Sequence, residues 1–202
     1  MPDQSGSLTP NINQTTRTIM HKIKRVSFIF RIIFQILFIA MPISLAIGWF
    51  NAPDALVLVG GFINFDAIPH AYATKILHTL STSEKLTGFL VSAVPMMVYL
   101  FIVYSLIKLF RLYEQGVIFS IEIVQHIRNI GYALLADQII SPFYQFAMGI
   151  VLTIHNPPGH GFIGITLDQN NLGILLTALL VILISWIMTE GCKLNEEQQL
   201  TV

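Results

Sequence analysis

Four long apolar segments, separated by shorter polar ones, dominate the pattern of residues along the chain. They run from Val26 to Phe50, from Gly88 to Phe110, from Asn129 to Ile154 and from Asn171 to Thr189. A helix of about 20 apolar residues is needed to cross the hydrocarbon core of a bilayer. The pattern therefore predicts an all-α membrane protein in which four transmembrane helices form one bundle.

Composition agrees with this prediction, because 54% of the residues are hydrophobic and only 11% are charged. A soluble domain carries about 25% charged residues. The net charge is zero, so no bulk electrostatic argument favours direct binding of nucleic acid. The single cysteine, Cys192, excludes an intramolecular disulfide framework and a cysteine-rich metal site.

The lysines and arginines predict the orientation of the helices. Nine of the eleven lie on one side of the four segments: Arg17, Lys22, Lys24, Arg25, Arg31, Lys108, Arg111, Arg128 and Lys193. The other side has only Lys75 and Lys85. Because basic residues are retained on the cytoplasmic side, we expect a multi-pass protein of the inner (cytoplasmic) membrane with both termini in the cytoplasm.

The polar segments complete the predicted layout. Residues 1–20 lack hydrophobic periodicity and are expected to form a disordered cytoplasmic tail. A membrane domain follows over 21–192, with spans at about 26–50, 88–110, 129–154 and 171–189, outer loops at 51–87 and 155–170, and an inner link at 111–128. Residues 193–202 form a second cytoplasmic tail. The first span is too long for a secretory signal and has no suitable cleavage site after it, so we expect it to remain as an anchor.

The first outer loop is too long for a simple connection. Its segment LVLVGGFINF places Gly60-Gly61 between two β-forming runs, which is typical of a β-hairpin. Tyr72, Ile76 and Leu80 recur at helical spacing. We expect a small extracytoplasmic cap, made of a β-hairpin plus a short helix and joined by a possible third strand, FIGITLD. The alternative is that LVLVGGFINF dips into the membrane interface.

Four histidines fall in the outer loops: His70, His78, His155 and His160. Histidine is a common metal ligand. However, HNPPGHG is first of all a turn sequence, and no carboxylate or cysteine completes a ligand set at recognisable spacing. We expect neither a metal nor another cofactor.

The inner link has the signals of a helix end, a turn and a new helix. Gly116 is placed to end the second span, Ser120 is suited to cap the next helix, and Glu122 lies in its first turn. The link is either a connector at the level of the lipid headgroups or a docking surface for a cytoplasmic protein. The candidate docking residues are Arg111, Tyr113, Glu114, Gly116, Phe119, Ser120, Glu122 and Arg128.

Two stretches, LFRLYEQGVIFSIEIVQHIRNIGY and the C-terminal TEGCKLNEEQQLTV, resemble the DUF2975 family of bacterial membrane proteins. Family members are similar in a Gly-x-Ile-Phe-Ser core, in a hydrophobic-Arg-x-x-Gly run entering the third span and in an acidic tail ending Leu-Thr-Val. The resemblance implies four spans and no established reaction. Members' genes often lie beside a small helix-turn-helix regulator, so the resemblance also implies a DNA-binding cytoplasmic partner.

Some ionisable residues lie inside the predicted spans. A carboxylate such as Asp137 costs about 2.5–3.5 kcal/mol near the bilayer centre, so it needs a partner in the bundle interior. Arg31 lies at similar depth in the first span, and we predict that it pairs with Asp137. The full intramembrane polar cluster would comprise Arg31, Gln35, Lys108, Asp137, Gln138 and Glu190.

Three roles remain open for this cluster: a proton or cation relay, a switchable pair in a sensor, and a structural ion pair that fixes helix register. No span shows a repeat of polar residues, which favours the structural role.

No HExxH, GxSxG, P-loop or paired-carboxylate motif occurs, so we expect no enzymatic activity. Three functions remain. The first is a membrane sensor or anchor for a small cytoplasmic DNA-binding regulator. The second is a small transporter or channel component that uses Asp137 and would need a homo-oligomer to enclose a pore. The third is an accessory subunit of a larger membrane assembly.

Overall fold

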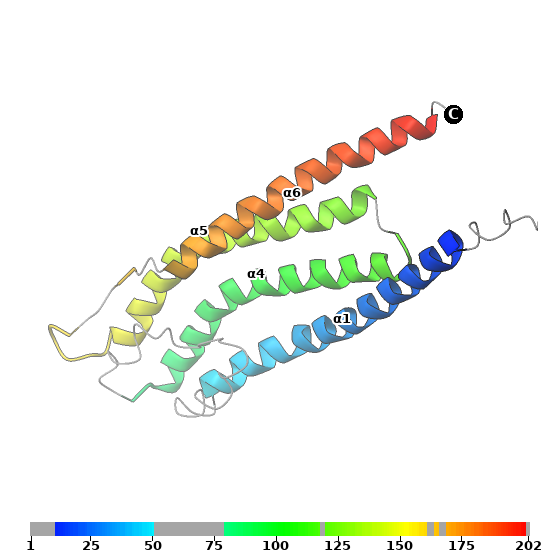
Figure 1. The fold of residues 1–202 in the computed structure, drawn as a ribbon. Helices are drawn as coiled ribbons and strands as arrows, with labels where there is room; N and C mark the ends of the chain where they lie inside the picture. Colours follow the sequence, from blue (N-terminus) through cyan, green and yellow to red (C-terminus); the bar gives the residue numbers. More distant parts are fainter. Residues whose placement is uncertain (1–10, 51–78, 118–119, 161–163, 166–168, 201–202) are drawn as a thin grey trace, which may run out of the picture.

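The computed structural model has four long helices in the part of the chain that it describes (Figure 1). They are α1 (Asn11–Phe50), α4 (Thr82–Glu114), α5 (Ile121–Thr153) and α6 (Gln169–Leu200). The structure describes residues 11–50, 79–117, 120–160, 164–165 and 169–200. All four helices contain a stretch that is long and apolar enough to cross a membrane, so the predicted all-α membrane protein is confirmed at this level.

Local capping signals determine where α4 and α5 begin and end. The Ser81 hydroxyl accepts a hydrogen bond from the Glu84 N–H, and the Glu84 carboxylate accepts one from the Ser81 N–H, which is a capping box. Gly116 has φ of 86° and ends α4. The Ser120 hydroxyl accepts from the Ile123 N–H and begins α5. The predicted helix end at Gly116 and cap at Ser120 are both confirmed.

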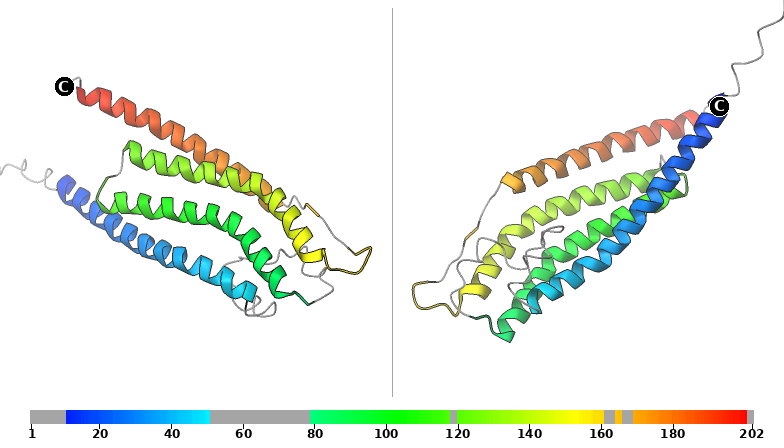
Figure 2. Two further views of the ribbon diagram at one scale, coloured as in Figure 1. Left: turned by 180° about the vertical axis from the view of Figure 1, so that it is seen from behind. Right: turned by 60° about the horizontal axis from the view of Figure 1, so that its bottom comes forward.

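The helices lie side by side in an open row in chain order, as Figures 1 and 2 show. α4 packs against α1 and α5, and α6 packs against α5, whereas helices that are not consecutive make little contact. The four helices of the expected bundle thus form an open row, with α1 and α6 at its two edges. We call the end with Glu114 and Ile121 the terminal end, because α1 begins and α6 ends there, and the opposite end the loop end.

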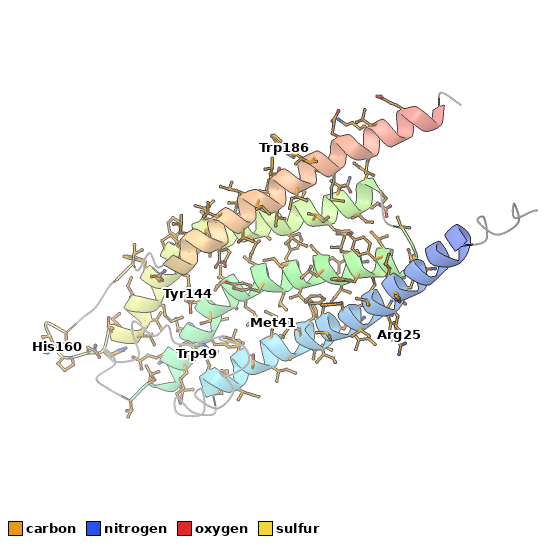
Figure 3. The ribbon with its side chains drawn as sticks, viewed as in Figure 1. Arg25, Met41, Trp49, Tyr144, His160 and Trp186 are labelled. Atoms are coloured by element: carbon orange, nitrogen blue, oxygen red, sulfur yellow. The ribbon has the colours of Figure 1, made fainter. Side chains whose placement is uncertain are left out.

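A shared core joins α1, α4 and α5 toward the loop end. Its buried members are Met41, Leu45, Trp49, Met96, Val103, Met148 and Leu152. Figure 3 shows Met41 and Trp49 between α1 and α4, while Trp186 lies on the outer side of α6 and is 65% exposed. Large exposed apolar side chains of this kind cover all four helices, which is the surface that lipid chains require.

Glycines allow two of the helix contacts to be close. A Cβ at Gly88 would overlap the Trp49 ring, whose Nε1–H donates to Ser92 Oγ at 3.2 Å. A Cβ at Gly131 would lie 2.6 Å from Cγ1 of Ile182. Small residues at such contacts are typical of membrane helices, because dispersion rather than the hydrophobic effect holds the helices together.

Two predicted tails are partly helical. α1 begins at Asn11, within the segment 1–20 that was expected to be disordered, and α6 continues through most of the predicted tail 193–202. The residues assigned to the β-hairpin and short helix of the outer cap fall almost entirely within 51–78 and 161–168, mostly outside the described residues. The described part of the chain contains no strand, so the cap stays a prediction.

Candidate functional site: a buried carboxylate between α4 and α5

Asp137 is the central residue of α5, with sixteen helical residues on each side. Its side chain is buried, and Oδ2 accepts hydrogen bonds from the Tyr99 hydroxyl at 3.2 Å and from Gln138 Nε2 at 3.2 Å. Tyr99 is itself near the midpoint of α4. The structure therefore places a carboxylate with two donors at the middle of the membrane-spanning region.

This site joins two helices through one polar contact. Burial of a carboxylate far from water is costly unless donors and partners compensate it. The Tyr99 hydroxyl comes from α4, and the side chains of Asp137 and Gln138 come from α5. The contact therefore sets the register of the antiparallel α4–α5 pair and also holds an ionisable group in the interior.

A row of polar side chains continues from Asp137 toward the loop end. Ser141 and Gln145 follow at intervals of four residues, which places them on neighbouring positions of one helix side. Gln145 Nε2 lies 3.2 Å from the Ser141 hydroxyl. The expectation that no span repeats polar residues is therefore wrong for α5. The four-residue spacing in DQIISPFYQ was the signal that could have revealed the row.

Arg31 does not pair with Asp137, and this prediction is wrong. The Arg31 guanidinium instead lies 2.8 Å from Glu114 Oε2 at the terminal end of α4. The reason is the open row: α1 has α4 as its neighbour, and α4 separates it from α5. Arg31 also lies over the Phe28 ring at 5.4 Å, which adds a cation–π contact.

The other members of the predicted polar cluster are also dispersed. Gln35 is exposed on α1. Lys108 Nζ lies 5.5 Å from the centre of the Tyr104 ring. Glu190 lies 3.5 Å from Lys193 one turn along α6. Of the six predicted residues, only Asp137 and Gln138 come together. Their partner Tyr99 was missed, because an apolar stretch with a tyrosine gives no sequence signal for a buried hydrogen bond.

The predicted docking residues divide into two groups. Glu114, Gly116 and Ser120 have structural roles in the ion pair to α1, in the end of α4 and in the cap of α5. Arg111 and Glu122 are exposed, while Tyr113 and Arg128 are half-buried. Phe119 lies outside the described residues. The exposed charges of this link are therefore available to a partner at the terminal end.

At the loop end, a second buried carboxylate was missed by sequence reasoning. Glu84 is 6% exposed, and its Oε1 lies 2.7 Å from His155 Nδ1, just after α5. The segment from His155 to His160 is a turn, as predicted, with Gly159 at φ of 89° and the His160 N–H donating to the Pro157 carbonyl. Among the described residues, no group of three or more potential metal ligands lies together.

Comparison with known proteins identifies the family. The model of a family described as "Protein of unknown function (DUF2975)" matches residues 69–202, which include α4, α5, α6 and the Asp137 site. Comparisons with curated proteins and with solved structures give no match. The resemblance found in the sequence is therefore confirmed: the chain is a membrane protein, with four helices able to span a membrane among its described residues, and it belongs to the DUF2975 family.

Proposed function

We propose that this protein is a non-enzymatic membrane anchor or sensor that holds a small helix-turn-helix regulator at its cytoplasmic side. The excess of basic residues favours a cytoplasmic terminal end. The observation that carries the proposal is the pair of helix ends that flank the α4–α5 link. A Schellman-type end closes α4 and a serine cap begins α5, while Arg111 and Glu122 remain exposed beside them.

The lengths of the two edge helices support the same proposal. α1 has 40 residues and α6 has 32, which correspond to about 60 Å and 48 Å at a rise of 1.5 Å per residue. The hydrocarbon core is about 30 Å thick. Both helices extend past the α4–α5 link at the terminal end (Figure 1). They provide helical surface outside the bilayer on either side of the link.

Co-purification tests this function. The tagged full-length protein is extracted in mild detergent from its own cells, and bound proteins are identified by mass spectrometry. We expect a small DNA-binding protein to co-purify. The combined charge reversal Arg111→Glu and Glu122→Arg should abolish this binding, whereas Lys85→Glu at the loop end should leave it unchanged. Retention of the regulator by the double variant, or absence of any DNA-binding protein, contradicts the proposal.

Asp137 supports a second candidate function, that of a small transporter or channel component. The supporting observation is a buried carboxylate at the helix midpoint, followed by a polar row toward the loop end. This function predicts that Asp137→Asn changes the flux of a proton or cation into vesicles that contain the protein, while Glu190→Gln does not. The anchor function predicts no change of flux in either variant.

A further inference from the structure

An open groove with a volume of about 430 Å³ lies between α4 and α5. Met97, Val98 and Phe101 line it from α4, and Tyr132, Ala133 and Ala136 line it from α5. The small side chains of the two alanines leave this volume unfilled. The larger side chains of Met97, Phe101 and Tyr132 lie beside the groove and are exposed. Apart from Asn129 and the Tyr132 hydroxyl, the lining is apolar, which fits a hydrocarbon chain.

The Tyr99–Asp137 hydrogen bond aligns α4 and α5 along their length and so brings two cations to the same level. Lys108 lies nine residues after Tyr99, and Arg128 lies nine residues before Asp137. Because α4 and α5 are antiparallel, both cations lie at one level, about 13–14 Å from the helix midpoints at 1.5 Å per residue. Half of the hydrocarbon core is about 15 Å, so this level is that of the lipid headgroups.

The groove and Lys108 share one face of α4. Lys108 follows Phe101 by seven residues, which is close to two full turns. Its Nζ lies over the Tyr104 ring, on the same side of the helix. Among the ion pairs of the described residues, none includes Lys108 or Arg128. An apolar groove thus lies toward two cations that form no ion pair with the acidic side chains that the structure describes.

We propose that an anionic phospholipid binds here, with an acyl chain in the α4–α5 groove and its phosphate between Lys108 and Arg128. Charge complementarity and the headgroup level of both cations select this occupant over a zwitterionic lipid or a second copy of the chain. The Asn129 amide, one residue from Arg128, adds a donor beside the phosphate. The site depends on the membrane position of α4 and α5 and not on the proposed regulator.

Native mass spectrometry of the full-length protein in detergent tests the proposal. Dioleoyl phosphatidylglycerol and dioleoyl phosphatidylcholine are added in equal amounts, and the ratio of bound lipids is measured. We expect preference for phosphatidylglycerol. One interfacial cation contributes about 1 kcal/mol to binding of anionic lipid, so Lys108→Gln should lower the preference about fivefold. Lys108→Gln with Arg128→Gln should lower it roughly 25-fold, if the two effects add.

Two further variants separate the groove from general surface charge. Lys22→Gln removes an exposed cation of α1 and should leave the preference unchanged. Ala136→Phe fills the groove and should weaken the binding of both lipids. The proposal is overturned if the wild type binds both lipids equally or if Lys22→Gln lowers the preference as strongly as Lys108→Gln. It is also overturned if the wild type is a dimer that Ala136→Phe converts to a monomer, because a second copy of the chain would then occupy the groove.

Discussion

Asp137 shows how one residue can determine the relation of two helices. A carboxylate inside a bilayer is tolerated only with donors, and this one has a donor from each of the two helices that it joins. The contact aligns the midpoints of α4 and α5. At the residue scale, the stability of the pair should therefore depend on the Tyr99 hydroxyl.

Tyr99→Phe removes that hydroxyl and keeps the ring. Interhelical hydrogen bonds in membrane proteins contribute about 0.6 kcal/mol on average and up to about 1.7 kcal/mol. We expect Tyr99→Phe to lower the free energy of unfolding within this range, as measured by titration with a denaturing detergent. Tyr104→Phe is the matched control, because that ring lies on the exposed side of α4. An equal effect of both substitutions would contradict a role of the Tyr99–Asp137 bond.

At the scale of elements, glycines determine the end of α4 and the contact between α5 and α6. Gly116 adopts φ of 86°, a conformation that other residues adopt only at a cost. Gly131 lies against α6, where an added Cβ would also be 3.3 Å from the Ile182 backbone nitrogen. Gly173 and Gly191 of α6 have no neighbouring atom within 4 Å of an added Cβ, so they provide internal controls.

Gly116→Ala should destabilise the protein by about 1–2 kcal/mol, because a left-handed conformation costs roughly that much for a residue with a Cβ. The same detergent titration measures the change. In contrast, Gly173→Ala lies within a helix with open space around it, and we expect it to be neutral or slightly stabilising. A Gly116→Ala variant as stable as the wild type would show that the link tolerates another backbone path.

Gly131→Ala should weaken the α5–α6 contact by about 1–2 kcal/mol, since overpacking of a close contact forces side chains or backbone to shift. Shortening the opposing side chain with Ile182→Ala should recover part of this loss, so a double-mutant cycle should give a favourable coupling between the two sites. Gly191→Ala should cause no such loss. Strictly additive effects of Gly131→Ala and Ile182→Ala would contradict the direct contact.

On the scale of the whole molecule, the open row gives each edge helix one neighbour and leaves broad faces to lipid. An even number of crossings places the start of α1 and the end of α6 at the same end (Figure 2). The basic residues then predict that this end is cytoplasmic.

Reporter fusions measure this orientation directly. A reporter that is active only in the cytoplasm should be active when fused after Val202 and inactive when inserted after Gly159 in the exposed turn at the loop end. Reversal of both results would invert the orientation and place Arg111 and Glu122 away from any cytoplasmic partner. Equal activity at both positions would contradict four crossings.

Much of the fold followed from local patterns, but the pairing of charges did not. The four apolar segments, the end of α4 at Gly116 and the cap at Ser120 depend on hydrophobic length and on hydrogen bonds within a few residues. The partner of Arg31 depends on which helices are neighbours. Arg31 and Asp137 lie at similar depths in their predicted spans, which led us to predict that they pair. The order of the helices instead places Arg31 beside Glu114.

By itself, the sequence determined the four apolar segments that are able to span a membrane as helices. Every backbone polar group in a bilayer must be hydrogen-bonded within its own helix, so the length of an apolar segment is sufficient to identify a membrane-spanning helix. Only the tertiary structure decided that the helices form an open row, that the Tyr99 hydroxyl donates a hydrogen bond to Asp137 and that an apolar groove lies between α4 and α5. The physical reason is that packing between helices depends on side-chain shape across residues that are distant in the chain, and a lipid-facing pattern of apolar residues does not specify it.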